Sequence, residues 1–430
     1  MFFRRLEAAG LERVPPEGPL LLVLNHPNSL VDPVFLFTMV PRPVSVLAKE
    51  PLFRMPVLGR IVRAMGAIPV ERRQDPGADL AKNREMFGRV RDHLARGGVV
   101  ALFPEGASHS DPRLRPIRTG AARIALGVRA SAPLRIQPVG LFYTAKERFR
   151  SAALVYFGEP FEVGPAPLDS QGEPPGELVQ ELTDRIAAAL AEVTLQADVH
   201  EAHDFIARTE RILASERRPS DGAARPGLSE EFEYRRRLLA GYRLLLERNP
   251  RLLERMHRRV GRYEDRLRGA GIDPWDVPRD RIRAGRVAGR IGVFLFRFLL
   301  FLPLGLPGFV IHFLPYRLVG ILARRAAGPA GDVLATAKVV TAAVVFPLGW
   351  IAVGLLVGWW KGAGWGIGAS LLAPVSGYSA LRLRETADRA FGSLRALLLW
   401  IAGRRSLLHL QAERRKLRED ILRLAGELGV

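Results

Sequence analysis

The fold is decided by residues 18–33, which read Gly-Pro-Leu-Leu-Leu-Val-Leu-Asn-His-Pro-Asn-Ser-Leu-Val-Asp-Pro. The apolar run after the Gly-Pro pair predicts a buried strand that ends in a loop at Asn25-His26-Pro27. Asp32-Pro33 then begins an apolar helix, since Asp is a good N-cap and Pro is favoured in the first turn. A buried strand that leads through a short loop into a helix is typical of an α/β sheet.

The same alternation continues over the first 195 residues. Further strands are predicted at Gly66–Val70, Gly98–Phe103, Leu134–Leu141 and Ala153–Phe157, and helices at Asp79–Arg96, Gly120–Arg129 and Glu177–Thr194. The last helix follows a stretch rich in Pro and Gly and is expected to pack back onto the sheet. Residues 1–195 are therefore predicted to form an α/β domain whose sheet is flanked by helices.

The composition changes after this domain. Residues 196–287 are rich in arginine and predict a helical connector. Residues 288–381 are expected to form a membrane region, in which the proline-interrupted segment 291–315 re-enters or lies at the bilayer surface. Segments 339–360 and 362–381 are long enough for a transmembrane hairpin. The alternative is a buried hairpin of a soluble domain, although soluble core helices seldom run about 20 residues without a charge.

Arginine clusters indicate how these segments are oriented. They occur at 281–290, at 317–325 and from 382 onward, whereas the turn at 358–364 carries only Lys361. The positive-inside rule places all of these clusters, and with them the α/β domain, on the cytoplasmic side of the membrane. For a bacterial protein this would be the inner membrane. Residues 382–430 mix Leu and Ile with basic residues and predict an amphipathic helix at the membrane surface.

The chain is strongly basic, with 64 Lys and Arg against 44 Asp and Glu and a formal net charge of +20. Such a charge attracts nucleic acid, anionic membranes and phosphorylated small molecules. Residues 51–150 hold 19 basic against 8 acidic residues, whereas residues 151–200 hold 1 against 9, so the basic surplus of the α/β domain is confined to its middle part. A nucleic-acid-binding protein would carry stacking aromatics or a known module on its basic face. Neither is visible, so no nucleic-acid partner is expected.

Residues suited to proton transfer follow the first strand. His26 and Asp32 are separated by five residues, and a loop-to-helix turn brings side chains at that spacing together. A carboxylate beside a histidine sets its tautomer and stabilises the imidazolium that forms when it accepts a proton. The alternative is that Asp32 only caps its helix and that His26 is bonded locally.

Three further groups follow later strands. Arg72 comes after the strand at 66–70, Glu105 lies in the run Phe103-Pro104-Glu105-Gly106-Ala107-Ser108-His109, and Pro138 precedes a basic loop with Lys146. Arg72 and Arg118 offer guanidinium groups that suit a phosphate, and Glu105 offers a carboxylate for substrate hydroxyls. Taken one by one, each is as well explained by a solvated charge or an ordinary core strand.

Together, these four blocks resemble the glycerolipid (PlsC-like) acyltransferase superfamily. Its blocks are His-x4-Asp, Gly-x-Ile-x-x-x-Arg, Phe-Pro-Glu-Gly-x-x and a strand with a proline, and the second and third match letter for letter. The longer first block, His-x-Asn-x-x-Val-Asp-Pro, is similar to the eukaryotic-type glycerol-3-phosphate/dihydroxyacetone-phosphate acyltransferase branch. The run Arg-Leu-Leu-Ala-Gly-Tyr at 237–242 and the apolar C-terminal segments resemble that branch as well.

The resemblance implies roles for these residues. His26 would be the general base on an acceptor hydroxyl, Asp32 would orient it, and Arg72 would bind the acceptor's phosphate. Glu105, Gly106 and Ser108 would shape the acceptor site, with Arg118 and Lys146 as further candidates for substrate binding, and Pro138 would lie on the acyl-donor side.

The resemblance implies a membrane-bound enzyme of phospholipid biosynthesis that uses acyl-CoA or acyl carrier protein as donor. The acceptor would be the sn-1 hydroxyl of glycerol 3-phosphate or dihydroxyacetone phosphate, or alternatively 1-acylglycerol 3-phosphate or another lysophospholipid. The lipid bilayer would be a further partner. A non-catalytic lipid-binding protein on the same fold stays open, although His26 and Asp32 together disfavour it.

Direct transfer to the acceptor agrees with the residues themselves. The chain has no cysteine and no Gly-x-Ser-x-Gly elbow, so nothing indicates a covalent acyl-enzyme. The sequence His200-Glu201-Ala202-His203-Asp204 lacks the His-Glu-x-x-His spacing of a zinc site. No metal and no cofactor other than the acyl donor is therefore expected.

Overall fold

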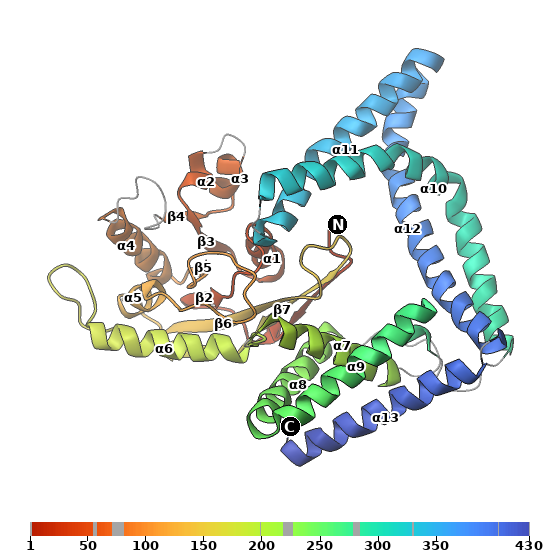
Figure 1. The fold of residues 1–430 in the computed structure, drawn as a ribbon. Coiled ribbons are helices and arrows are strands. Elements are labelled where there is room, and N and C mark those ends of the chain that lie inside the picture. The colour runs from red at the N-terminus through yellow and green to blue at the C-terminus, as the bar shows by residue number, and fades with distance from the viewer. Residues whose placement is uncertain are drawn as a thin grey trace. The chain divides into compact units, whose positions relative to one another are not determined.

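The computed structural model describes residues 2–54, 58–70, 81–197, 199–217, 227–277, 284–328, 331–402 and 404–429. The chain divides into two compact units. The first comprises Met1–His200, Leu228–Phe232 and Pro329–Thr336, and the second comprises Glu201–Gly227, Glu233–Gly328 and Ala337–Val430. Figure 1 shows that the strands lie in the first unit and that long helices make up the second.

The first unit is built on a mixed sheet. Its strands are β1 (Arg5–Ala9), β2 (Leu20–Leu24), β3 (Val44–Lys49), β4 (Ile68–Val70), β5 (Val99–Leu102), β6 (Leu134–Tyr143), β7 (Ala152–Phe157) and β8 (Phe161–Val163). Their order is β1-β7-β6-β2-β5-β3-β4, with β8 also paired to β6. β2 runs parallel to both β5 and β6, whereas β7 and β8 pair with β6 in the antiparallel sense.

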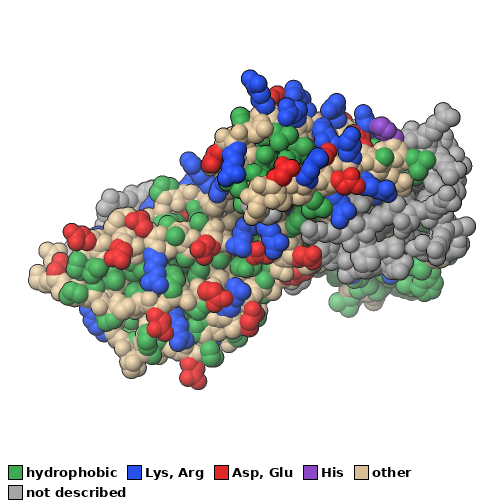
Figure 2. All heavy atoms as spheres, turned by 90° about the horizontal axis from the view of Figure 1, so that it is seen from below, with side chains coloured by type: hydrophobic (Ala, Val, Ile, Leu, Met, Phe, Trp, Pro, Cys, Tyr) green, Lys and Arg blue, Asp and Glu red, His purple; other side chains and the backbone are tan. Residues whose placement is uncertain are grey.

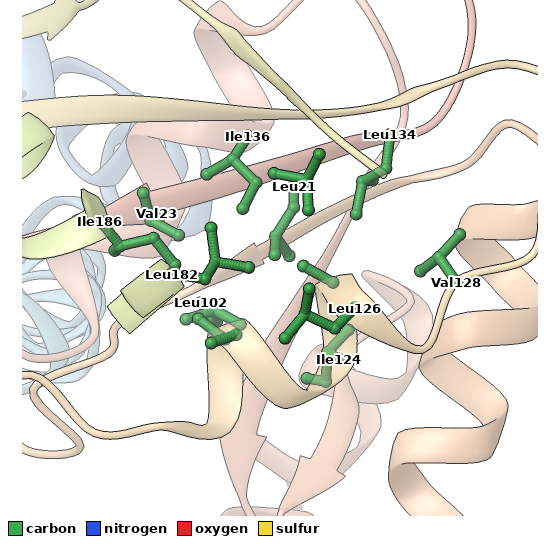
Figure 3. Packing of buried hydrophobic residues seen from close by; sticks show 14 of the residues in the cluster. Leu21, Val23, Leu102, Ile124, Leu126, Val128, Leu134, Ile136, Leu182 and Ile186 are labelled. Atoms are coloured by element: carbon green, nitrogen blue, oxygen red, sulfur yellow. The ribbon is translucent and has the colours of Figure 1, made fainter. Parts of the chain in front are cut away.

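The central strand β2 is buried on both faces. Leu21 and Val23 belong to a core shared with α6 (Gly176–Glu192), and Leu20, Leu22 and Leu24 belong to a second core on the opposite face. Because successive strand residues point to opposite faces, an unbroken apolar run fits only a strand covered on both sides. Figure 3 shows Leu21 and Val23 directed toward Leu182 and Ile186 of α6.

Helices cover both faces of the sheet. The helices of this unit are α1 (Val31–Met39), α2 (Pro51–Arg54), α3 (Leu58–Ala64), α4 (Ala81–Ala95), α5 (Gly120–Leu126) and α6, and a short 3₁₀ helix, η1, spans Leu11–Arg13. Side chains of α4, α5 and α6 share one core, and Phe35 and Leu36 of α1 belong to the other. The predicted flanking of the sheet by helices is therefore confirmed, including the return of α6.

All five strands expected from the sequence are present, but three others were missed. β1 lies at one end of the strand order and contains Arg5 and Glu7, which form an ion pair, and charged residues are common in edge strands. β3 alternates buried and partly exposed residues over only six positions, and β8 has only three residues. Short or half-exposed strands carry too few apolar residues for the pattern to detect them.

Polar helices form one part of the second unit, except that His200 and Leu228–Phe232 at the starts of two of them belong to the first. They are α7 (His200–Arg217), α8 (Leu228–Arg248), α9 (Pro250–Ala270) and α13 (Arg404–Leu428), with the 3₁₀ helix η2 at Pro274–Asp276. The buried residues of α9 recur every three or four positions, at Leu253, Met256, Val260, Tyr263 and Leu267, as in an amphipathic helix. Its cap, Asn249, accepts a hydrogen bond from the Leu252 amide at 3.1 Å. On the face drawn in Figure 2, Lys and Arg side chains gather in the upper middle of the view, whereas basic and acidic side chains are interspersed over its left part.

Three apolar helices follow. The segment 291–315, expected to re-enter or lie at the bilayer surface, belongs to the first of them, α10 (Ala284–Ala327), which continues through Pro303, Pro307 and Pro315. Each proline lacks the N–H group that would make one backbone hydrogen bond of the helix. In apolar helices, neighbouring helices and small local adjustments satisfy the carbonyl group that is left without a partner.

The helix boundaries after α10 differ from the predicted ones. α11 (Gly331–Lys361) and α12 (Ala363–Ala402) meet at Gly362, whose φ of +96° suits glycine, in agreement with the predicted turn. The expected boundary at 381/382 is no helix end, since α12 continues to Ala402 before α13 begins. Segments Gly292–Ala327 and Val333–Lys361 are long and apolar enough to cross a membrane, and large side chains such as Val310 and Leu355 are exposed on them.

Glycines let α10, α11 and α12 approach closely. A Cβ on Gly308 of α10 would lie 2.0 Å from the carbonyl oxygen of Ser376 in α12, and one on Gly354 of α11 would lie 2.9 Å from that of Gly366. Small residues at helix contacts are typical of membrane helices, where close packing replaces the hydrophobic effect.

We expect Gly308→Ala to destabilise the contact between α10 and α12, because the added methyl group overlaps a backbone atom of α12. Overpacking of this kind costs about 1–3 kcal/mol. The measurement is the thermal unfolding temperature of the detergent-solubilised protein. Gly320→Ala is the matched control, since a Cβ at Gly320 of the same helix meets nothing within 4 Å. Equal unfolding temperatures for the two variants would contradict this account of the packing.

Candidate active site

The carboxyl ends of three parallel strands meet at one edge of the sheet. In β2 and β5, Val23 pairs with Leu102, and in β2 and β6, Leu24 pairs with Val139. The loops after β2 and β5 therefore leave the sheet side by side, next to the last residues of β6. Ligands of α/β sheets bind at such an edge.

The structure brings His26 and Asp32 together. His26 Nδ1 lies 2.9 Å from Asp32 Oδ2, and the Asp32 side chain is fully buried while 17% of the His26 side chain is exposed. Because a carboxylate only accepts, Nδ1 donates and carries the ring proton, which leaves Nε2 as the basic atom. In the loop between them, Ser29 has a φ of +41°, in the left-handed region.

Asp32 accepts two further hydrogen bonds. The amide of Asn28 donates to the same Oδ2 at 2.7 Å, and the hydroxyl of Tyr143 donates to Oδ1. Burial, together with the adjacent Asp32 carboxylate, raises the pKa of Tyr143 well above its ordinary value, so the hydroxyl stays protonated. Sequence reasoning missed Tyr143, although it ends the apolar strand that runs beside β2.

The ring of His26 is held from the side as well. Phe103, which follows β5, stacks on it with ring centroids 3.9 Å apart. The side-chain amide of the preceding residue, Asn25, bonds to the backbone of Leu141 in β6. Its Nδ2 donates to the Leu141 carbonyl at 3.1 Å, and its Oδ1 accepts from the Leu141 amide at 2.7 Å, as the backbone of a neighbouring strand would. These contacts fix where the loop leaves the sheet and how the imidazole faces.

Glu105 joins the loop after β5 to His26. Its Oε1 accepts from the His26 amide at 3.1 Å, and its Oε2 accepts from the Arg115 amide at 2.8 Å and from His109 Nε2. His109 Nδ1 accepts from the Asp111 amide at 3.1 Å, which places the ring proton on Nε2. Glu105, a candidate for shaping the acceptor site, is 3% exposed, and both of its carboxylate oxygens are bonded within the protein.

Four other candidate residues, Gly106, Ser108, Arg118 and Lys146, lie in the loops that follow β5 and β6. Gly106 has a φ of +75°, and Arg118 packs over it, since a Cβ there would lie 2.6 Å from Arg118 Nε. Ser108 lies partly buried in the same loop. Lys146 Nζ donates to the carbonyl of Pro27 and to Ser110 Oγ, both at 2.7 Å, so it ties the two loops together.

Pro138 and Arg72 complete the set of candidate residues. Pro138 is inside β6, between the residues that pair with β8 and those that pair with β7, where its missing N–H is not needed. Arg72 lies outside the described residues. In the described part of the chain, no group of three His, Asp or Glu side chains is arranged to hold a metal ion.

The described arrangement provides a base with a buried carboxylate behind it. His26 Nε2 is placed to accept a proton, and Asp32 stabilises the positive charge that results. With Nδ1 occupied and the ring stacked, the imidazole does not need to reorient when it reacts. The chemistry that this supports is deprotonation of a hydroxyl group.

Comparisons with known proteins show what the chain is similar to. A family model described as Acyltransferase matches residues 5–141, and the model of the Glycerol-3-phosphate acyltransferase 2 C-terminal domain matches residues 220–429. The crystal structure of a 1-acyl-sn-glycerophosphate acyltransferase from Thermotoga maritima is 18% identical, with a TM-score of 0.32, and the match covers 45% of this chain and 73% of that one.

Two yeast proteins match along the whole chain. Glycerol-3-phosphate O-acyltransferase 1 of Saccharomyces cerevisiae is 26% identical, and the match covers 100% of this chain and 69% of that protein. An uncharacterized acyltransferase of Schizosaccharomyces pombe is also 26% identical, with 100% of this chain and 79% of that protein covered. The matched domains and these relatives together place the chain in a family: it belongs to the PlsC-like glycerolipid acyltransferase superfamily, in the eukaryotic-type glycerol-3-phosphate acyltransferase branch.

Proposed function

We propose that this chain is a membrane-bound O-acyltransferase of phospholipid biosynthesis. It transfers a fatty acyl group from acyl-CoA or acyl carrier protein to the sn-1 hydroxyl of glycerol 3-phosphate, or to the corresponding hydroxyl of dihydroxyacetone phosphate. The observation that carries the proposal is the His26–Asp32 pair, 2.9 Å apart at the carboxyl edge of the sheet. The matched domains and the yeast relatives support it.

The proposed reaction is a single displacement at the thioester. His26 Nε2 accepts the proton of the acceptor hydroxyl while the oxygen attacks the thioester carbonyl carbon. The carbon–sulfur bond then breaks, and the imidazolium returns the proton to the departing thiolate. Asp32 stabilises the imidazolium in between. The reaction needs no cofactor other than the acyl donor, and holding both substrates against the base supplies much of the rate.

The acceptor's phosphate needs cationic groups near the base. Arg118, over Gly106 in the loop after β5, and Lys146, bonded to the carbonyl of Pro27, are described candidates, and Arg72 is a candidate from the sequence. A lysophosphatidate or another lysophospholipid also presents a hydroxyl near a phosphate, so 1-acylglycerol-3-phosphate acyltransferase activity is the alternative. Three plant and algal relatives with names of that kind match about a third of this chain.

The apolar helices support the proposed membrane binding. Segments Gly292–Ala327 and Val333–Lys361 expose apolar side chains along their length, and a bilayer is the environment in which such surfaces are stable. The arginine clusters beside them favour the cytoplasmic side for the site. The reaction would then be carried out where water-soluble donors meet a membrane-bound product.

We expect His26→Ala to lower kcat by about 100- to 10,000-fold, because the general base is lost. The assay follows labelled oleoyl-CoA and glycerol 3-phosphate in membranes that contain the protein. His200→Ala is the matched control, since His200 is an exposed histidine at the start of α7 and should leave kcat unchanged. Undiminished transfer by His26→Ala would reject the proposed chemistry.

The acceptor is identified by supplying glycerol 3-phosphate, dihydroxyacetone phosphate and 1-acylglycerol 3-phosphate separately with the same donor. We expect the highest kcat/KM with glycerol 3-phosphate. A preference for 1-acylglycerol 3-phosphate would replace the proposed acceptor with the alternative.

Arg118→Ala is expected to raise the KM for the phosphorylated acceptor by about 10- to 100-fold, with a smaller change in kcat, because a charge-assisted hydrogen bond to phosphate is lost. Arg118→Lys should recover only part of the affinity, since it keeps the charge but not the bidentate geometry. The control is Arg135→Ala, at the start of β6, where the side chain pairs with Glu162. A KM unchanged by Arg118→Ala would show that the phosphate is held elsewhere.

A further inference from the structure

The two oxygens of Asp32 have different partners. Oδ2 accepts from His26 Nδ1 at 2.9 Å and from the Asn28 amide at 2.7 Å, while Oδ1 accepts from the hydroxyl of Tyr143. A carboxylate held at both oxygens has no freedom to rotate about its Cβ–Cγ bond. The direction in which Asp32 presents Oδ2 to the imidazole therefore depends on Tyr143.

Tyr143 is itself firmly placed. It is the last residue of β6, which is paired on both sides, to β2 and to β7. Its ring packs against Phe3 and Phe35, with centroid distances of 5.5 and 6.0 Å. Since Asp32 lies at the start of α1 and His26 in the loop before it, the hydroxyl ties the helix end of this turn to the end of β6, as Asn25 ties its strand end to Leu141.

We infer that Tyr143 is a positioning residue of the catalytic pair, so that the machinery is a Tyr–Asp–His relay in which the hydroxyl of Tyr143 aligns Asp32 and Asp32 aligns His26. The inference rests on the proposed function, because it assigns Tyr143 a part in the base catalysis of His26. Tyr143 acts through Asp32 and is given no contact with substrate.

Tyr143→Phe tests this most directly, because it removes the hydroxyl and keeps the ring in its aromatic cluster. We expect kcat to fall by about 10- to 100-fold, the value of a hydrogen bond to a charged group, with both KM values within about twofold of the unchanged protein. Tyr156→Phe is the matched control: Tyr156 is a partly buried tyrosine of β7 in the same sheet, close to Arg13, and has no role in the pair.

A change in pH dependence separates positioning from general destabilisation. The titratable groups around the pair are Tyr143 in β6, Lys146 in the loop after it, and Glu105 and His109 in the loop after β5. Without the hydroxyl, more negative charge remains on Asp32 and favours the protonated imidazole. The acid limb of the pH–rate profile of Tyr143→Phe should therefore move to higher pH, whereas a smaller folded fraction would lower the rate equally at every pH.

Three outcomes decide the matter. A lower kcat with a shifted acid limb, in a variant that unfolds at the same temperature as Tyr156→Phe, supports the relay. The relay is overturned if Tyr143→Phe keeps the wild-type kcat, or if its kcat falls but the acid limb of its pH–rate profile does not move. In both cases His26→Ala would still lose transfer, so the proposed function would stand. Undiminished transfer by His26→Ala overturns the proposed function itself, so the two failures are distinguishable.

Discussion

Hydrogen bonding between β2 and its two parallel neighbours is the constraint on which the site depends. The register that pairs Val23 with Leu102 and Leu24 with Val139 puts the ends of β2, β5 and β6 at one edge. His26, Glu105 and Tyr143 follow or end these three strands, and a shift of the register by one residue would separate them. The apolar run of β2, buried on both faces, holds that register because neither face tolerates a polar side chain.

Once the strand ends are together, buried polar groups determine how the site is assembled. Asp32 and Glu105 are carboxylates with little or no exposure, and a buried charge is stable only when its oxygens are hydrogen-bonded. Backbone amides of Asn28, His26 and Arg115 supply part of these bonds, and the side chains of His26, Tyr143 and His109 supply others. The loops are therefore fixed by the same bonds that orient the base.

The second unit follows a different principle. Its amphipathic helices, α9 among them, bury an apolar stripe against their neighbours as helices of water-soluble domains do. Helices α10 and α11 expose apolar side chains and approach their neighbours through glycine. Inside this apolar group, His312 Nε2 accepts a hydrogen bond of 2.9 Å from the indole of Trp350, and its Nδ1 lies 2.8 Å from the carbonyl of Gly308. A polar residue among apolar helices is thus satisfied on both nitrogens.

The sequence alone determined the α/β class, the central buried strand, the turn at Gly362 and the proximity of His26 to Asp32, because each depends on residues close together in the chain. Only the tertiary structure decided that Tyr143, 111 residues beyond Asp32, donates to it, and that Glu105 is bonded to the backbone of His26, 79 residues away. It also decided that 291–315 continues as one helix through its prolines. The physical reason is that local sequence patterns show which face of a helix or strand a residue occupies and where a strand ends. Strand order and register in the sheet decide which strand ends lie next to each other, and local patterns do not contain that information.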